Sequence, residues 1–166
     1  MLYEKAQKEI FTALAKGNRV CGCTNKNGDY IVTTDGIVAF VIPVAIIAFN
    51  VIRVPRVESM EQFFVPCTPE YEIQITPFTR KGPFRRDISV RIFDNHGDHV
   101  YVNEKFLVYW HNPTFYQEKG KLDAAITVAE TMYDEQSKET KQMPVGLILP
   151  MRCSFSETIR EVDKGG

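Results

Sequence analysis

Val145-Gly-Leu-Ile-Leu-Pro-Met-Arg152 is a short apolar segment whose pattern also occurs earlier in the chain. Val38-Ala-Phe-Val-Ile-Pro-Val44 has an apolar residue at each aligned position and a proline at the same place. Short apolar runs bounded by turn residues are typical of buried strands, and proline suits a strand end or edge because it has no N–H to donate. The echo predicts two similar halves, each of which ends in a buried strand.

The composition is that of one globular domain. The chain has 166 residues, of which 44% are hydrophobic and 25% are charged, which excludes a disordered or low-complexity protein. Its formal net charge of −1 gives no overall attraction to nucleic acid or to an anionic membrane. Residues 37–49 carry no charge, but this run is shorter than the roughly 20 residues that a bilayer span needs. We therefore expect no membrane partner.

The four cysteines do not form a metal or redox motif. Cys21 and Cys23 are two positions apart, unlike the Cys-x-x-Cys spacing of such motifs, and no second pair follows them. Reduced cysteines that pack as small hydrophobic side chains are the simpler interpretation. The N-terminal segment also lacks the apolar core of a signal peptide. These features predict a cytoplasmic protein without a cofactor.

Hydrophobic periodicity predicts a helix followed by three strands in the first half. Apolar side chains of residues 3–16 fall on one helical face, and Asn27-Gly28 is a strong hairpin signal. The predicted strands cover residues 19–24, 30–34 and 37–42. For residues 45–54 we favour a short helix or an extended connector, and residues 58–64 suit one or two helical turns.

The second half predicts a meander, a helix and a return to apolar strands. Asn103 is a suitable N-cap for a helix over residues 103–110. Residues 135–142 contain no apolar side chain, which indicates an exposed loop or a hairpin tip. The predicted strands cover residues 71–77, 88–92, 99–102, 124–130 and 145–151.

Together these elements predict an α+β domain with a mainly antiparallel sheet and two helices. We expect one domain over residues 1–152, internally duplicated, with two similar halves at about residues 3–54 and 71–152. A C-terminal tail at residues 153–166 follows.

This order of elements resembles one domain of a bacterial DNA sliding clamp, a family whose domains are internally duplicated, with two helices packed under antiparallel sheets. Leu149-Pro-Met-Arg152 resembles the terminal strand of that clamp, and Thr34-Asp-Gly36 resembles one of its hairpins. The predicted helix at residues 103–110 falls where a clamp domain has its second helix. The resemblance implies a DNA-clamp-like domain. The chain also looks like the short proteins that bacterial mobile elements carry.

Three departures from the clamp pattern bear on function. The chain is too short for the several domains of a full clamp protomer, and it continues past Arg152. In the predicted second helix, Glu104 and Lys105 cancel in charge, so that helix has no basic face. Ring closure around DNA is therefore not implied.

A basic turn is the best candidate for nucleic-acid binding. Guanidinium groups match phosphate geometry, and an aromatic ring can stack on a base. The alternative is a solvated turn without a ligand. The candidate residues are Arg80, Lys81, Phe84, Arg85 and Arg86.

A second turn holds the densest group of potential metal ligands. Carboxylates and imidazoles at close spacing can bind a divalent ion, but the same residue types are ordinary turn formers between two strands. The candidate ligands are Asp94, His96, Asp98 and His99.

An aromatic-rich segment suits either a binding surface or a helix packed on the sheet. Its members are Phe106, Tyr109, Trp110, Phe115 and Tyr116. No nucleophile motif or phosphate loop is present in the sequence.

The leading hypothesis is therefore a non-enzymatic interaction protein that binds protein or nucleic acid. The alternative is a metal-dependent enzyme that uses the turn at residues 94–99. The sequence is compatible with a homo-oligomer, and it identifies no protein-binding residue.

Overall fold

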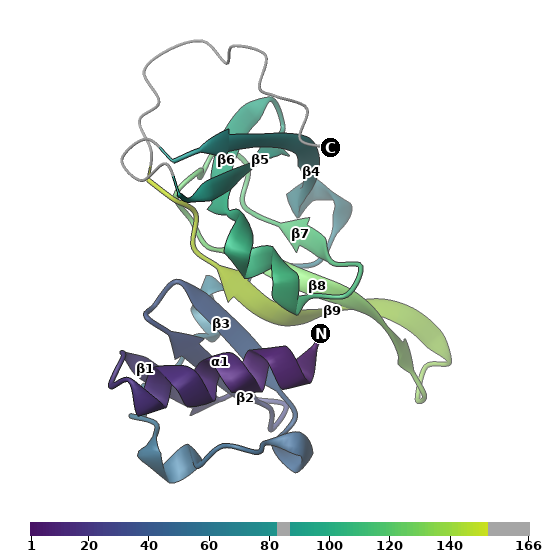
Figure 1. The fold of residues 1–166 in the computed structure, drawn as a ribbon. Helices are drawn as coiled ribbons and strands as arrows, with labels where there is room; N and C mark the ends of the chain where they lie inside the picture. Colours follow the sequence, from purple (N-terminus) through teal and green to yellow (C-terminus); the bar gives the residue numbers. More distant parts are fainter. Residues whose placement is uncertain (83–86, 153–166) are drawn as a thin grey trace.

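The computed structural model describes residues 1–82 and 87–152, and these residues build one sheet and one α-helix, α1 (Tyr3–Ala15) (Figure 1). Within these ranges the sheet has nine strands in the order β1-β2-β3-β9-β8-β7-β4-β5-β6, and neighbouring strands are antiparallel. The predicted α+β class with a mainly antiparallel sheet is confirmed.

The strands are β1 (Val20–Thr24), β2 (Tyr30–Thr34), β3 (Val38–Ile42), β4 (Glu72–Lys81), β5 (Ser89–Asn95), β6 (Asp98–Asn103), β7 (Thr114–Tyr116), β8 (Ile126–Asp134) and β9 (Glu139–Ile148). Short 3-10 helices are η1 (Val44–Ile46), η2 (Val51–Arg53), η3 (Glu61–Phe63), η4 (Pro69–Tyr71) and η5 (Glu104–Tyr109).

Helix α1 forms where the apolar spacing predicts it. Ala6, Ile10 and Ala13 are its buried residues, so a single stripe faces the core. The helix ends at Ala15, and Gly17 beyond the C-cap Lys16 takes a positive φ of 69°. The Asn18 N–H then donates to the Ala13 carbonyl over 2.9 Å, which is the hydrogen bond of a glycine-terminated helix cap.

Several details differ from the prediction. The segment at residues 103–110 is helical, but η5 is a 3-10 helix capped by the Asn103 side chain, which accepts from the Lys105 N–H. The three-residue strand β7 is too short to show an alternating pattern, and the sequence did not reveal it. Of the predicted loop or hairpin tip at residues 135–142, residues 135–138 form the tip of the β8–β9 hairpin, and residues 139–142 already belong to β9. These residues pair only with β8 and are mostly exposed. They therefore lack the alternating apolar side chains that would predict a strand.

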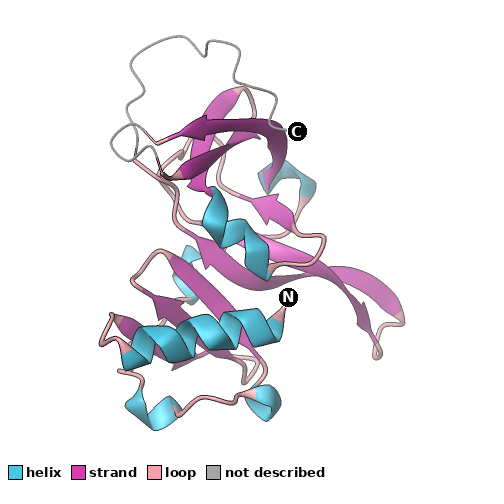
Figure 2. Cartoon of the chain, viewed as in Figure 1, coloured by secondary structure: helices cyan, strands magenta, loops and turns pink. Residues whose placement is uncertain are grey.

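Helices α1 and η5 pack on the same side of the sheet (Figure 2). The Leu2 N–H before α1 donates to the Tyr109 carbonyl at the end of η5 over 2.8 Å, which ties them together. Strand β3 alternates between the two faces: Val38, Phe40 and Ile42 belong to the core under the helices, and Ala39 belongs to a second cluster on the opposite face.

Trp110 sits directly on the backbone of the central strand β9. A Cβ atom at Gly146 would collide with the Trp110 ring and lie 2.5 Å from the Ala39 carbonyl oxygen. The indole N–H of Trp110 donates to the Phe106 carbonyl over 2.8 Å, and the ring also contacts Phe40 at 5.6 Å between centroids. Glycine at position 146 is therefore what allows η5 to approach the sheet.

We expect Gly146→Ala to destabilise the fold by about 1–3 kcal/mol, because the added methyl group overpacks a filled site. The same change in a Trp110→Leu background should cost less, since the smaller side chain leaves room. Urea unfolding of the four proteins of this double-mutant cycle measures the coupling. Equal costs in the two backgrounds would contradict the proposed packing.

Candidate binding groove

The face of the sheet opposite the helices is covered by an irregular segment, residues 54–66. Here Ile31, Ala39 and Leu147 pack with Met60 in the second hydrophobic cluster. Gly22 of β1 fixes the start of the segment, accepting from the Val57 N–H and donating to the Pro55 carbonyl, both over 3.0 Å. Met60, with Val57 and Phe64 packed beside it, and a few backbone hydrogen bonds thus take the place of a packed helix.

A groove of about 510 Å³ lies between this segment and the sheet. Its rim is formed by three large apolar side chains that remain partly exposed: Ile37 (39%), Leu149 (43%) and Phe63 (53%). None of the described residues that line it carries a charge. They are Cys21, Thr33, Gly36, Ile37, Val38, Ala39, Val57, Ser59, Met60, Gln62, Phe63, Ala125, Leu147 and Leu149.

Few polar groups line the groove, and the structure explains the state of two of them, the Thr33 hydroxyl and the Cys21 thiol. The Thr33 hydroxyl donates to the Val38 carbonyl over 2.9 Å. Burial raises the pKa of the Cys21 thiol, and the neighbouring Cys23 raises it further, which keeps the thiol protonated and a poor nucleophile. The described lining therefore suits the burial of apolar groups better than catalysis.

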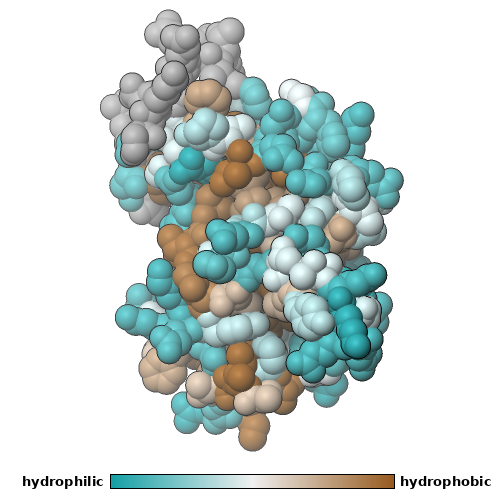
Figure 3. Space-filling view, turned by 90° about the vertical axis from the view of Figure 1, so that its right-hand side faces the viewer, coloured by the Kyte–Doolittle hydropathy of each residue, from teal (hydrophilic) through white to brown (hydrophobic). Residues whose placement is uncertain are grey.

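A smaller hollow of about 340 Å³ lies on the other side of the 54–66 segment. Unlike the groove, it is lined in part by charged residues, among them Lys26, Asp29 and Glu61. On the face shown in Figure 3, hydrophobic side chains reach the surface in separate patches among hydrophilic ones. An uncharged lining thus sets the groove apart from the smaller hollow.

The aromatic-rich segment lies mostly in the core. Phe106, Trp110, Phe115 and Tyr116 are each at most 9% exposed, and Phe115 makes an edge-to-face contact with Phe93 at 4.8 Å between ring centroids. Packing on the sheet is therefore the interpretation that the structure supports, instead of an open binding surface.

The turn between β5 and β6 does not assemble a metal centre. Its geometry is that of a tight hairpin, with positive φ at His96 and Gly97 and with the Asp94 carboxylate accepting from the Gly97 N–H over 2.6 Å. Within residues 1–82 and 87–152, no group of three His, Cys, Asp or Glu side chains lies close enough to hold an ion. Asp94, His96, Asp98 and His99 are thus explained as turn and strand residues, and the metal alternative gains no support.

The basic turn is only partly within the described residues. Arg80 and Lys81 end strand β4, the first half-buried and the second exposed. Phe84, Arg85 and Arg86 lie outside the described residues. Nucleic-acid binding by this turn therefore stays a prediction.

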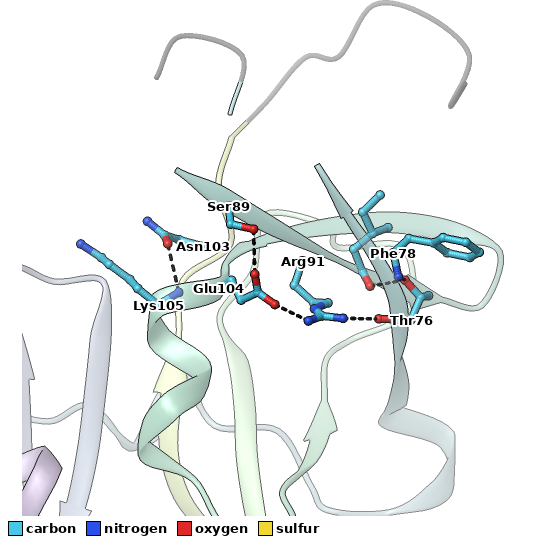
Figure 4. Close-up of polar contacts among 8 residues, drawn as sticks. Thr76, Phe78, Ser89, Arg91, Asn103, Glu104 and Lys105 are labelled. Atoms are coloured by element: carbon cyan, nitrogen blue, oxygen red, sulfur yellow. Dashed lines mark hydrogen bonds and ion pairs between the residues drawn. The ribbon is translucent and has the colours of Figure 1, made fainter. Parts of the chain in front are cut away.

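A polar network lies beside this turn and joins β4, β5 and η5 (Figure 4). The Glu104 carboxylate accepts from the Ser89 hydroxyl over 2.7 Å and forms an ion pair with Arg91. Arg91 also donates to the Thr76 carbonyl over 3.3 Å. The hydrogen bond from Ser89 lowers the pKa of Glu104 most. The hydrogen bond from Arg91 and the positive charges of Arg91 and Lys81 lower this pKa further. Glu104 therefore offsets part of the positive charge beside the basic turn.

Comparisons with known proteins find no family model, no curated protein and no solved structure that matches this chain. In the described part of the chain, no helix has the length and apolar character to cross a membrane.

If the basic turn binds nucleic acid, replacing Arg80, Lys81, Arg85 and Arg86 by Ser should abolish binding measured by fluorescence anisotropy with labelled DNA. Binding of the unchanged protein should weaken steeply with salt, because phosphate contacts release counterions. The matched control replaces Lys5, Lys8, Lys16 and Arg19, which are exposed, and removes the same charge. Absence of binding at low salt, or equal loss in both variants, would rule out this site.

Proposed function

We propose that this protein is a non-enzymatic binding module whose groove captures an apolar segment of a protein partner. The observation that carries the proposal is a groove with an uncharged lining and a rim of three partly exposed apolar side chains. Clustered apolar side chains at a concave surface mark interaction sites more often than scattered ones do.

The rim has a geometry that suits capture of apolar side chains. Leu149 and Ile37 lie side by side, because the Leu149 N–H donates to the Ile37 carbonyl over 2.7 Å. Phe63 approaches from the 54–66 segment on the other side. An apolar side chain buried between these walls contributes about 1.5–3 kcal/mol, and the volume falls within the usual range for ligand sites.

We further propose that the fold is a DNA-clamp-like domain built from two repeats. In support, α1 precedes the meander β1-β2-β3, and η5 precedes the meander β7-β8-β9. The two meanders meet through β3 and β9 in the sheet order β1-β2-β3-β9-β8-β7. On this view the repeats are residues 3–42 and 104–148, which narrows the predicted halves at residues 3–54 and 71–152, because strands β4 to β6 are an insertion that extends the sheet.

The pairing of β3 with β9 restricts how the two repeats can be aligned by a two-fold axis. In the sequence echo, Ala39 aligns with Gly146 and Phe40 aligns with Leu147. In the sheet, Ala39 pairs with Leu147 and Phe40 pairs with Gly146. Ala39 and Leu147 lie on the groove face, whereas Phe40 and Gly146 face the helices. The echo therefore matches residues on opposite faces, and a two-fold axis that keeps both helices on one side requires an alignment shifted by one residue.

Superposition of the two repeats in a crystal structure tests the duplication. We expect α1 to fall on η5, and β1, β2 and β3 to fall on β7, β8 and β9, with Ala39 over Leu147 or Phe40 over Gly146, the opposite pairs through which a two-fold axis can pass. A best superposition that shifts β3 away from β9 would contradict the repeat.

Selection from a random-peptide library on the immobilised protein tests the groove. We expect enrichment of peptides with closely spaced apolar residues, and a loss of affinity of at least about tenfold for Leu149→Glu and Ile37→Glu, because a bound apolar side chain would then desolvate a carboxylate.

The matched control is Ile52→Glu. Ile52 is 95% exposed and lies outside the groove, so this change adds the same charge and should leave peptide affinity unchanged. Circular dichroism and thermal unfolding establish that all three variants are folded. No enriched peptide, or equal weakening by the control, would overturn the proposed function.

A further inference from the structure

The hairpin β8–β9 projects beyond the rest of the sheet (Figure 1). Strand β7 pairs with β8 only as far as Ala129, and β3 pairs with β9 only as far as Gly146. Beyond these points β8 and β9 pair with each other, out to Asp134 and Glu139. We call residues 130–143 the arm.

The base of the arm is held firmly. The buried Glu130 carboxylate accepts from the His111 N–H over 3.1 Å. The tip is also ordered by its own side chains, since Asp134 accepts from Lys141 over 2.7 Å and from the Ser137 hydroxyl over 3.0 Å. The arm is therefore a defined two-stranded ribbon, an element that has little stability alone in water.

Strands with unpaired edges invite association, and proteins protect such edges with proline, with lysine or with a covering segment. The β1 edge is covered at Gly22 by residues 55–57. Beyond its pairing with β7, strand β4 carries Pro77 and Lys81. The outer edge of β9 carries Lys141 within the arm and Pro144 directly beside it.

The outer edge of β8 has none of these protections. Its sequence there is Thr131-Met132-Tyr133, and no described strand pairs with it on that side. Thr131 is exposed and Tyr133 is 62% exposed. All three residues are compatible with a strand, and the carboxylates on either side of them are already paired, Glu130 with the N-terminal amine and Asp134 with Lys141.

We propose that this β8 edge pairs with the same edge of a second copy of the chain. Antiparallel pairing of two identical strands has two-fold symmetry, so the edge is complementary to itself. With the axis at Met132, Thr131 lies opposite the partner's Tyr133, an aromatic–threonine pair that suits a sheet. The two arms then form one four-stranded sheet.

This dimer is independent of the proposed groove. None of the residues that line the groove belongs to the arm. Failure of peptide capture would leave the dimer intact, and a monomeric protein would leave peptide capture intact.

Sedimentation velocity over low to high micromolar concentrations tests the pairing. We expect the unchanged protein to shift from monomer to dimer, and Tyr133→Lys to stay monomeric, because lysine protects an edge. The control Thr140→Lys adds the same charge directly across the hairpin, since Thr140 pairs with Tyr133, and it should dimerise normally. A monomeric unchanged protein would overturn the proposal. So would equal loss in both variants, which would indicate contact through the face of the arm.

Cysteine cross-linking locates the axis. Directly opposite residues of an antiparallel pair are close enough for a disulfide, so Met132→Cys should cross-link to the same residue of the partner under mild oxidation. Thr140→Cys should not. Mass spectrometry of the linked peptides distinguishes these bonds from bonds of the native cysteines, and cross-linking through position 140 but not 132 would refute the β8–β8 geometry.

Discussion

The antiparallel pairing of β3 with β9 is the constraint on which the rest of the structure depends. It joins the meander at the start of the chain to the meander at its end, through pairs such as Ala39 with Leu147. Both strands are buried where they meet. A slip of one residue would reverse the faces of the side chains, which would move Phe40 away from the helices and expose it.

The same register determines the groove. Because Phe40 faces the helices, its neighbour Ala39 must face the opposite side. Ala39 and Ala125 are small, so they leave space above the sheet that the 54–66 segment does not fill. The segment lacks regular structure over most of its length and buries Met60 against the groove face of the sheet. The helix face is thus packed with aromatic rings, and the opposite face retains an open apolar volume.

Local pattern was enough to predict β2, whose bounds were predicted correctly, and α1 to within one residue. Features that depend on tertiary pairing were missed. Strand β7 has only three residues, and the outer part of β9 is polar because the arm is open to solvent on both faces. The groove could not be predicted, because it combines residues from β1, β2, β3, β9 and the 54–66 segment, and no periodicity relates them.

The terminal motif that carries the clamp resemblance also has a structural role in this chain. Strand β9 ends at Ile148, and Leu149 then lies on the groove rim. Met151 leaves the β3–β9 region and donates its N–H to the Tyr101 carbonyl of β6 over 2.8 Å. The motif therefore connects the centre of the sheet to its far edge, a connection that the fold needs whatever the protein binds.

On α1, Lys5 and Lys8 are interspersed with Glu4 and Glu9, so the helix face offers little net charge to a polyanion. An uncharged groove on the opposite face needs no such field, which is why the physical chemistry of this chain favours capture of an apolar protein segment.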